Sequence, residues 1–417
     1  TARANILFII DTSGSMVTRV ETQAPYSAGT AYAGCYQADA VYFSANGTRP
    51  ACGSPDFFPK AQNRCAAARE PLQFAGFFAD GVLAWDSARE RWDALVADGG
   101  DRPVECLADR GVDGADGPTR PFAADGPGGP WAADATQEPA WTRRYTLYDG
   151  NWLNWNVGAP LVQRTRLEVV QSTVDTLART LRNVNVGVMR FNSREGGSIV
   201  KAAQPIESTR AEVIAAVDAL APSGSTPLSE TLFEATQYFG GRNVVYGNRD
   251  TRSVAESRVG GTATSNTYLT PISEPCSRNF IILLTDGEPA DDVGADALIT
   301  ALPGFGTLVA PDCDGTGDGR CLDDLAEYLY RYDFDPELAG VQNVVTHTIG
   351  FDLDLPLLAD TARRGGGEYH LANDIGTLST ALSGIVASIL DNAGSFAAPA
   401  IPVNAYNRAA SSNDVYL

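Results

Sequence analysis

Four continuous runs of β-branched and other apolar residues constrain the fold of this chain most strongly. They span residues 4–10, 184–191, 279–285 and 343–351. Such runs are typical of strands buried on both faces of a parallel sheet. Between them, apolar residues recur every three or four positions, which predicts helices over 164–181, 209–220, 226–239 and 375–390. Strands alternating with helices predict an α/β fold with a doubly wound, mostly parallel sheet.

Long insertions interrupt this alternation. Residues 17–160 separate the first predicted strand from its crossover helix, and a segment of this length predicts a subdomain instead of a loop. We therefore expect a main domain at residues 1–16 and 161–395, an insertion at 17–160, and an extended segment at 396–417. A second interruption, residues 240–276, is rich in Gly, Ser, Thr and Asn and predicts a flexible surface excursion.

Charge excludes one class of partner. The chain has 31 Lys and Arg against 51 Asp and Glu, a formal net charge of −20. The phosphate backbone of a nucleic acid would be repelled, so we expect no nucleic-acid partner. Its apolar runs also fall well short of the roughly 20 residues that a membrane-spanning helix needs.

The cysteines indicate an oxidising compartment. Cys35, Cys52, Cys65 and Cys106 lie in the insertion, and Cys313 and Cys321 flank a Gly-rich segment. These spacings lack the close Cys or His pairs of zinc sites and predict disulfides, including Cys313–Cys321, with the pairing inside the insertion left open. The remaining Cys276 precedes a core strand and is predicted to be a free thiol.

Hydroxyl and carboxyl side chains gather where two predicted strands end and one helix begins. Asp11, Ser13 and Ser15 directly follow the first strand, Asp286 directly follows another, and Thr226 opens a helix. Ligands of open parallel sheets bind at the carboxyl ends of the strands. Because all the candidate ligand atoms are oxygens, they suit a hard divalent cation such as Mg²⁺, Mn²⁺ or Ca²⁺.

These side chains have two alternative interpretations. Asp, Ser and Thr also cap helices, and Thr226 stands at a favourable helix start. A nucleophilic Ser13 or Ser15 would need a neighbouring base, and the chain has two histidines. His347 lies in a predicted buried strand and His370 at the end of another strand, so both are expected to be structural. We therefore expect a protein that is not an enzyme.

An acidic segment near residue 318 and the aromatic residues of the insertion each have two possible interpretations. The acidic segment partly matches a calcium-binding EF-hand loop at Asp312, Asp314, Thr316, Asp318 and Asp323. Its last position lacks the usual Glu, and a disulfide would close the loop, so an acidic hairpin is preferred. The aromatic residues of the insertion, "WLNW" especially, predict either an adhesive surface or the core of a small subdomain.

The motifs D-x-S-x-S, a Thr heading a helix and T-D-G after a strand, in this order, resemble the metal-ion-dependent adhesion site of von Willebrand factor A domains, a Rossmann-like family. The resemblance implies that Ser13 and Ser15 coordinate the ion directly and that Thr226 does so when ligand is bound. It implies that Asp11 and Asp286 act directly or through water. One coordination position would be left for an acidic group of a ligand.

A wider resemblance covers nearly the whole chain. "YTLYDGNWLNW", "GSTPLSETLFEATQYFGG", "FIILLTDGEP" and "SFAAPAIPVNAYNR" resemble the amino-terminal region of PilY-type adhesins of type IV pili. This implies an exported protein at the cell surface or pilus tip, or associated with the outer membrane, whose next domain is a β-propeller.

The implied function is metal-dependent adhesion to an acidic group of a host or surface protein, together with contacts to minor pilins. Pilus assembly, twitching motility, surface sensing and virulence are the implied roles. The alternative is a structural tip cap or assembly-priming subunit in which the ion only stabilises a subunit contact.

Overall fold

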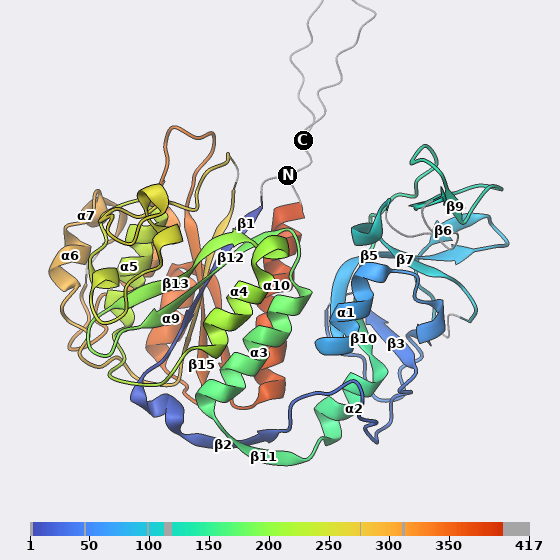
Figure 1. The fold of residues 1–417 in the computed structure, drawn as a ribbon, viewed down its shortest axis with the longest axis horizontal. Coiled ribbons are helices and arrows are strands. Elements are labelled where there is room, and N and C mark those ends of the chain that lie inside the picture. The colour runs from blue at the N-terminus through green and yellow to red at the C-terminus, as the bar shows by residue number, and fades with distance from the viewer. Residues whose placement is uncertain are drawn as a thin grey trace, which may run out of the picture.

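A main domain and an insertion, joined by a two-stranded ribbon, form the described part of the chain (Figure 1). The structure is a computed structural model that describes residues 3–45, 47–97, 100–111, 119–275, 277–310 and 313–394. The predictions for Cys276, Asp312 and the segment 396–417 therefore lie outside the described residues.

The main domain is built on a six-stranded sheet in the order β13-β12-β1-β14-β15-β16. Neighbouring strands run parallel, except that β13 is antiparallel to β12. The four apolar runs form the four central strands, and the antiparallel edge strand β13 was not predicted. The strands are β1 (Ala4–Ile10), β12 (Val184–Phe191), β13 (Gly197–Pro205), β14 (Asn279–Thr285), β15 (Val344–Phe351) and β16 (Gly366–Ala372).

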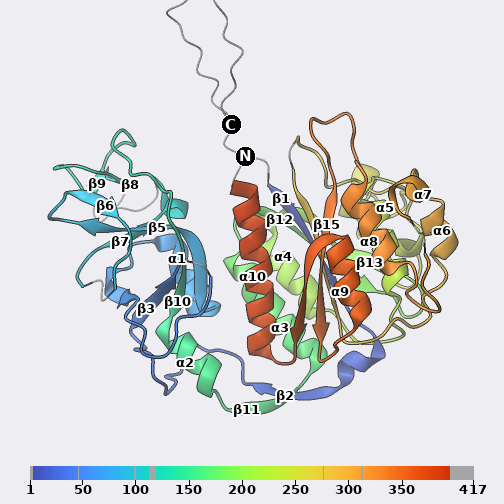
Figure 2. The same cartoon turned by 180° about the vertical axis from the view of Figure 1, so that it is seen from behind.

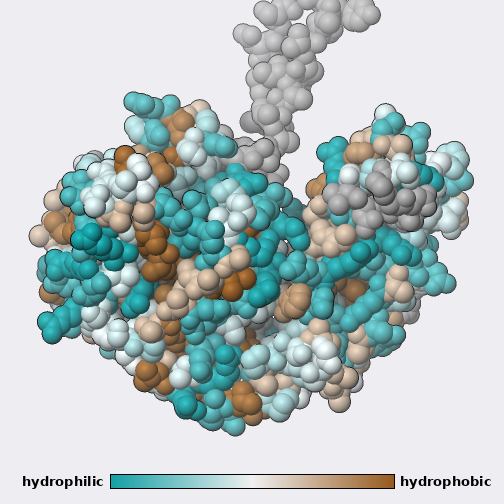
Figure 3. Space-filling view, viewed as in Figure 1, coloured by the Kyte–Doolittle hydropathy of each residue, from teal (hydrophilic) through white to brown (hydrophobic). Residues whose placement is uncertain are grey.

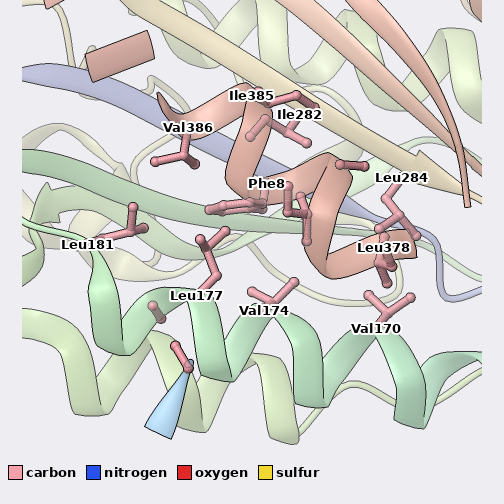
Figure 4. Close-up of a cluster of buried hydrophobic side chains, with 14 of the residues drawn as sticks. Phe8, Val170, Val174, Leu177, Leu181, Ile282, Leu284, Leu378, Ile385 and Val386 are labelled. Atoms are coloured by element: carbon pink, nitrogen blue, oxygen red, sulfur yellow. The ribbon is translucent and has the colours of Figure 1, made fainter. Parts of the chain in front are cut away.

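Helices cover both faces of this sheet (Figure 1, Figure 2), which explains why its central strands are apolar throughout. One face packs against α3 (Arg166–Thr180), α4 (Ile206–Asp218) and α10 (Ile375–Gly394). Figure 4 shows Phe8 and Ile282 of the sheet among side chains of α3 and α10. The other face carries α5 (Leu228–Phe239), α6 (Asp296–Thr300), α7 (Phe305–Leu308), α8 (Leu322–Arg331) and α9 (Pro356–Arg364).

The ribbon pairs β2 (Arg19–Gln23) antiparallel with β11 (Leu161–Thr165) and connects the main domain to the insertion. The insertion has an antiparallel sheet in the order β4-β3-β10-β5-β6, with β7 paired to β5. Its elements are β3 (Ala40–Ser44), β4 (Phe57–Pro59), α1 (Ala66–Phe74), β5 (Phe77–Asp86), β6 (Arg91–Asp93), β7 (Val104–Cys106), β8 (Phe122–Ala123), β9 (Trp131–Ala132), β10 (Arg144–Asp149) and α2 (Gly150–Gly158).

Disulfides and buried aromatic residues hold the insertion together. Disulfides join Cys35 to Cys52 and Cys65 to Cys106 there, and the predicted Cys313–Cys321 bond is confirmed in the main domain. The "WLNW" residues Trp152 and Trp155 are buried, as are Trp85, Trp92 and Trp131. These five residues therefore form core. On the face in Figure 3, hydrophobic residues lie in small scattered groups on a mostly hydrophilic surface.

The described residues of 240–276 lie largely at the surface, as predicted, but buried residues anchor them to the main domain. They form the short turns η5 (Tyr246–Asn248), η6 (Ala255–Ser257) and η7 (Val259–Gly261). Arg258 is fully buried and donates to the carbonyl oxygens of Ser253 (3.0 Å) and Gly247 (2.8 Å). The Tyr268 hydroxyl donates to Glu234 of α5 at 2.7 Å. The buried polar groups of this segment are therefore hydrogen-bonded to the protein, although its composition resembles that of a solvated loop.

Several carboxylates of the acidic segment bind groups of the protein itself. Asp318 accepts a hydrogen bond from the backbone N–H of Asp292 at 2.8 Å. Arg364 pairs with Asp323 at 3.0 Å and also with Asp324. With the Cys313–Cys321 disulfide, these contacts favour the closed hairpin over a calcium loop among the described residues.

Two buried carboxylates sit at the start of α5. Glu230 accepts from the backbone N–H groups of Gly196 (2.7 Å) and Gly294 (2.8 Å). Asp292 accepts from those of Ser229 (2.8 Å) and Glu230 (3.1 Å). Burial raises the pKa of Glu230 to about 7 and that of Asp292 to about 7.

We expect these carboxylates to make the protein less stable as pH rises. Because their pKa values are higher in the folded than in the unfolded chain, their stabilising contribution is complete below about pH 4 and is lost as pH rises through about 7. Between about pH 5 and pH 8, the free energy of unfolding should fall by on the order of 1–2 kcal/mol per group. Urea unfolding of Glu230→Gln should show a flatter pH dependence, while Glu337→Gln, at an exposed position, should match the wild type. Equal slopes in all three proteins would contradict this.

Candidate metal centre

Asp11 ties the ends of two adjacent strands together. It follows β1 directly, and its backbone N–H continues the pairing with β14 by donating to the Leu284 carbonyl oxygen at 2.9 Å. Its Oδ1 accepts from the backbone N–H of Ser13 at 2.6 Å. Its Oδ2 accepts from the Thr285 hydroxyl at 2.6 Å and the Asp286 N–H at 3.3 Å. The carboxylate is fully buried and held from both strands.

A row of oxygens leads from the first motif to the second carboxylate. The hydroxyl oxygens of Ser13 and Ser15 are 2.8 Å apart. Ser15 Oγ then donates to Asp286 Oδ1 at 2.5 Å. Ser13 and Asp286 at the two ends of the row are buried, whereas Ser15 between them is exposed, so the row meets solvent at Ser15.

Thr226 reaches the same place from a loop that is more than two hundred residues away in sequence. This loop is held by backbone hydrogen bonds from Gly14 N–H to Gly224 O (2.9 Å) and from Ser223 N–H to Thr12 O (2.6 Å). The helix-cap interpretation of Thr226 is wrong in detail, since α5 starts at Leu228 and Asp292 accepts from its first free N–H groups. The Thr226 hydroxyl is therefore not used as the cap.

Gly287 leaves the space in which these side chains meet. A Cβ placed on Gly287 would lie 3.1 Å from Thr226 Oγ1 and 3.6 Å from Ser15 Oγ. Hydroxyls of two remote segments thus border one small volume that a larger residue would fill. An all-oxygen donor set around such a cradle fits a hard divalent cation.

The site carries concentrated negative charge. Burial, and then the nearby charge of Asp286, raises the pKa of Asp11 to about 6. The two carboxylates repel each other when both are ionised, and a cation beside them would reduce that repulsion.

All five predicted residues, Asp11, Ser13, Ser15, Thr226 and Asp286, lie at the carboxyl end of the sheet. Sequence reasoning did not find Thr285, Gly287 or Arg166, which contact or border them. Thr285 and Gly287 flank Asp286 in the T-D-G motif and could have been found there, whereas no sequence pattern around Arg166 indicates its contact with Asp286.

Elsewhere, Cys65, Glu105 and Cys106 bring possible ligand atoms within 4.8 Å of one another, but both thiols are used in the Cys65–Cys106 disulfide.

Comparison with known proteins gives remote structural likenesses. No protein-family model matches the chain, and no curated protein matches it. One similar structure is the von Willebrand factor domain of the type V pili tip protein Mfa5 from Porphyromonas gingivalis. It is 13% identical with a TM-score of 0.32, and the match covers 54% of this chain and 89% of that one. The PilB minor pilin from Streptococcus sanguinis is 14% identical with a TM-score of 0.33, covering 55% of each chain.

A third similar structure is proximal thread matrix protein 1 from the mussel byssus, with a zinc-occupied MIDAS motif. It is 14% identical with a TM-score of 0.28, and the match covers 53% of this chain and 42% of that one. At such low identities and TM-scores, these likenesses assign no ligand or activity to the present chain. Among the described residues, no helix is both long and apolar enough to cross a membrane.

Proposed function

We propose that this chain is a von Willebrand A-type adhesion module that binds acidic ligands through a divalent cation and acts, exported, at the tip of a type IV pilus. The observation that carries the metal-dependent part is the convergence of five oxygen-bearing side chains from three remote segments. The pilus-tip assignment is supported by the sequence resemblance to PilY-type adhesins.

Asp11, Ser13, Ser15, Thr226 and Asp286 would hold Mg²⁺, Mn²⁺ or Ca²⁺. The bound ion would supply an electrophilic position for a ligand carboxylate. Asp11 is buried and fixed by three hydrogen bonds, so it anchors the site. Exposed Ser15 marks the side from which ligand approaches.

The location of the site suits ligand capture. β1 ends at the edge of the molecule that also carries the ribbon, while α10 ends at Gly394 on the opposite side (Figure 1). A ligand at the site therefore would not meet the end of α10. The ribbon begins at this edge and would form part of the rim that sets specificity, while the insertion packs along α3, where Arg179 lies over the Phe74 ring (Figure 1).

A binding role accounts for the serines better than nucleophilic catalysis does. Ser13 and Ser15 hydrogen-bond to each other, and Ser15 also donates to Asp286. His347 is engaged elsewhere, where its Nδ1 accepts from the Glu368 N–H at 3.1 Å. Among the described residues, neither serine hydrogen-bonds to a histidine, so neither has a histidine as its activating base. We accordingly propose that the protein is not an enzyme.

Removing the ion should abolish adhesion. Binding of purified protein to cells or immobilised matrix is expected to disappear in EDTA, to return with Mg²⁺ or Mn²⁺, and to be blocked by soluble carboxylates. Thr226→Ala should weaken ligand capture about tenfold or more, because one hydrogen-bonding or coordinating oxygen contributes on the order of 1–2 kcal/mol. The same substitution should change Mn²⁺ affinity less. Surface plasmon resonance and calorimetry measure the two quantities separately.

Ser225→Ala is the matched control, since its hydroxyl faces the Arg194 carbonyl oxygen (3.1 Å) next to Thr226. Adhesion that persists in EDTA and in Thr226→Ala would transfer binding to the insertion. Normal ligand binding combined with defective pilus assembly in the ion-site variants would instead favour the structural tip cap.

A further inference from the structure

Arg166 places a permanent positive charge on one of the candidate ion ligands. Its Nη1 donates to Asp286 Oδ2 at 2.8 Å, and its Nη2 donates to Asp352 Oδ2 at 2.5 Å. The Asp286 side chain is 0% exposed and the Arg166 side chain 14% exposed, so solvent screens this pair weakly. Asp286 therefore divides its oxygens between Ser15 and Arg166.

The backbone around Arg166 is fixed from both sides. It is the first residue of α3, whose capping box joins Thr165 and Glu168. Its own N–H donates to the Thr18 carbonyl oxygen at 2.9 Å, just beyond Ser15 and at the base of the ribbon. Its Nε is buried without a hydrogen-bond partner among the described residues, which is a destabilising feature. Optimising stability alone would not favour that arrangement.

We propose that Arg166 sets the charge of the ion site by neutralising Asp286, so that the site binds its cation less tightly and leaves more of the cation's charge for an acidic ligand. This inference rests on the proposed function. Asp11 and Asp286 together carry a charge of −2, and the positive charge of Arg166 reduces the net charge of the site to −1. A divalent ion would then keep a net positive charge, which attracts a carboxylate. Asp352 pairs with the same guanidinium and offsets part of this effect, although solvent screens its 49% exposed side chain.

Two measurements should change in opposite directions. In Arg166→Gln, Mn²⁺ measured by calorimetry should bind about tenfold tighter, since a unit charge a few Å from a divalent ion contributes at least about 1–2 kcal/mol even at high dielectric constant. Acetate binding to the Mn²⁺-loaded protein, measured by paramagnetic relaxation of its methyl protons, should weaken severalfold. A side chain that only supported the fold would not produce opposite shifts in the two affinities.

Two variants separate charge from geometry and from general electrostatics. Arg166→Lys keeps the charge without the two-pronged contact, so its Mn²⁺ affinity should stay close to that of the wild type. Arg164→Gln removes a positive charge from β11, two residues before Arg166, where the Arg164 guanidinium donates to Ser172 at 3.0 Å. Its Mn²⁺ affinity should stay within about twofold of the wild-type value. Thermal melting checks that each variant is folded.

Each outcome has a distinct meaning. Failure of the wild type to bind Mn²⁺ would refute the proposed function. Wild-type binding with unchanged or weaker Mn²⁺ affinity in Arg166→Gln would overturn the inference and leave the proposed function standing. If Arg166→Gln does not fold, Asp352→Asn decides, because Arg166 then opposes Asp286 alone and Mn²⁺ should bind more weakly. Unchanged or tighter binding in Asp352→Asn would likewise overturn the inference.

Discussion

Asp11→Asn combined with Ser13→Ala is expected to eliminate Mg²⁺ and Mn²⁺ binding. The double substitution removes the most deeply buried charge of the site and one of its hydroxyls. A divalent cation needs negative charge to offset the loss of its hydration shell. Calorimetry should therefore show no binding heat at ion concentrations that saturate the wild type. Retained binding would place the ion elsewhere.

The same substitution should also lower stability. Asp11 accepts from Ser13 N–H, Thr285 Oγ1 and Asp286 N–H across the two strand ends. Asn retains one carbonyl oxygen, so at least one buried donor loses its acceptor, which costs about 1–3 kcal/mol. Simple truncation to Ala would expose more unsatisfied donors. Ser225→Ala, one residue from Thr226, is the folded control and should bind both ions like the wild type.

Loss of the Cys65–Cys106 disulfide is expected to destabilise the insertion by about 4 kcal/mol, because the bond closes a loop with a sequence separation of 41 residues. Cys65 directly precedes α1 and Cys106 ends β7, so the bond joins the helix of the insertion to its sheet. The double variant Cys65→Ser and Cys106→Ser should unfold at a clearly lower temperature in calorimetry. Mn²⁺ binding should remain, since all five candidate ligands belong to the main domain.

Cys313→Ser with Cys321→Ser is the matched comparison. That disulfide spans a separation of only 8 residues and should contribute about 2.5 kcal/mol in the same loop-entropy treatment. Its loss should affect the main domain and leave the insertion intact. Equal losses for the two pairs, or a loss of Mn²⁺ binding without the Cys65–Cys106 bond, would contradict this division.

The central strands could be predicted because their burial is visible in their own residues. A strand covered on both faces needs apolar residues at every position, so residues 4–10 and 279–285 are recognisable without knowledge of their neighbours. The candidate site was also accessible, because carboxyl ends of parallel strands meet at one sheet edge. Asp11 and Asp286 each follow such a strand, and their hydroxyl neighbours stand within a few residues.

Features that depend on remote partners could not be predicted in this way. The segment 240–275 has the composition of a solvated loop, yet Arg258 and Tyr268 are buried because carbonyl and carboxylate acceptors meet them there. The sequence therefore determined which side chains stand at strand ends and what ion chemistry they offer. Tertiary structure alone placed Arg166 on Asp286 across 120 residues, and so decided how much of that negative charge remains for a cation. The physical reason is that burial pattern is a local property of the chain, whereas the pairing of charges depends on which distant segments the fold brings together.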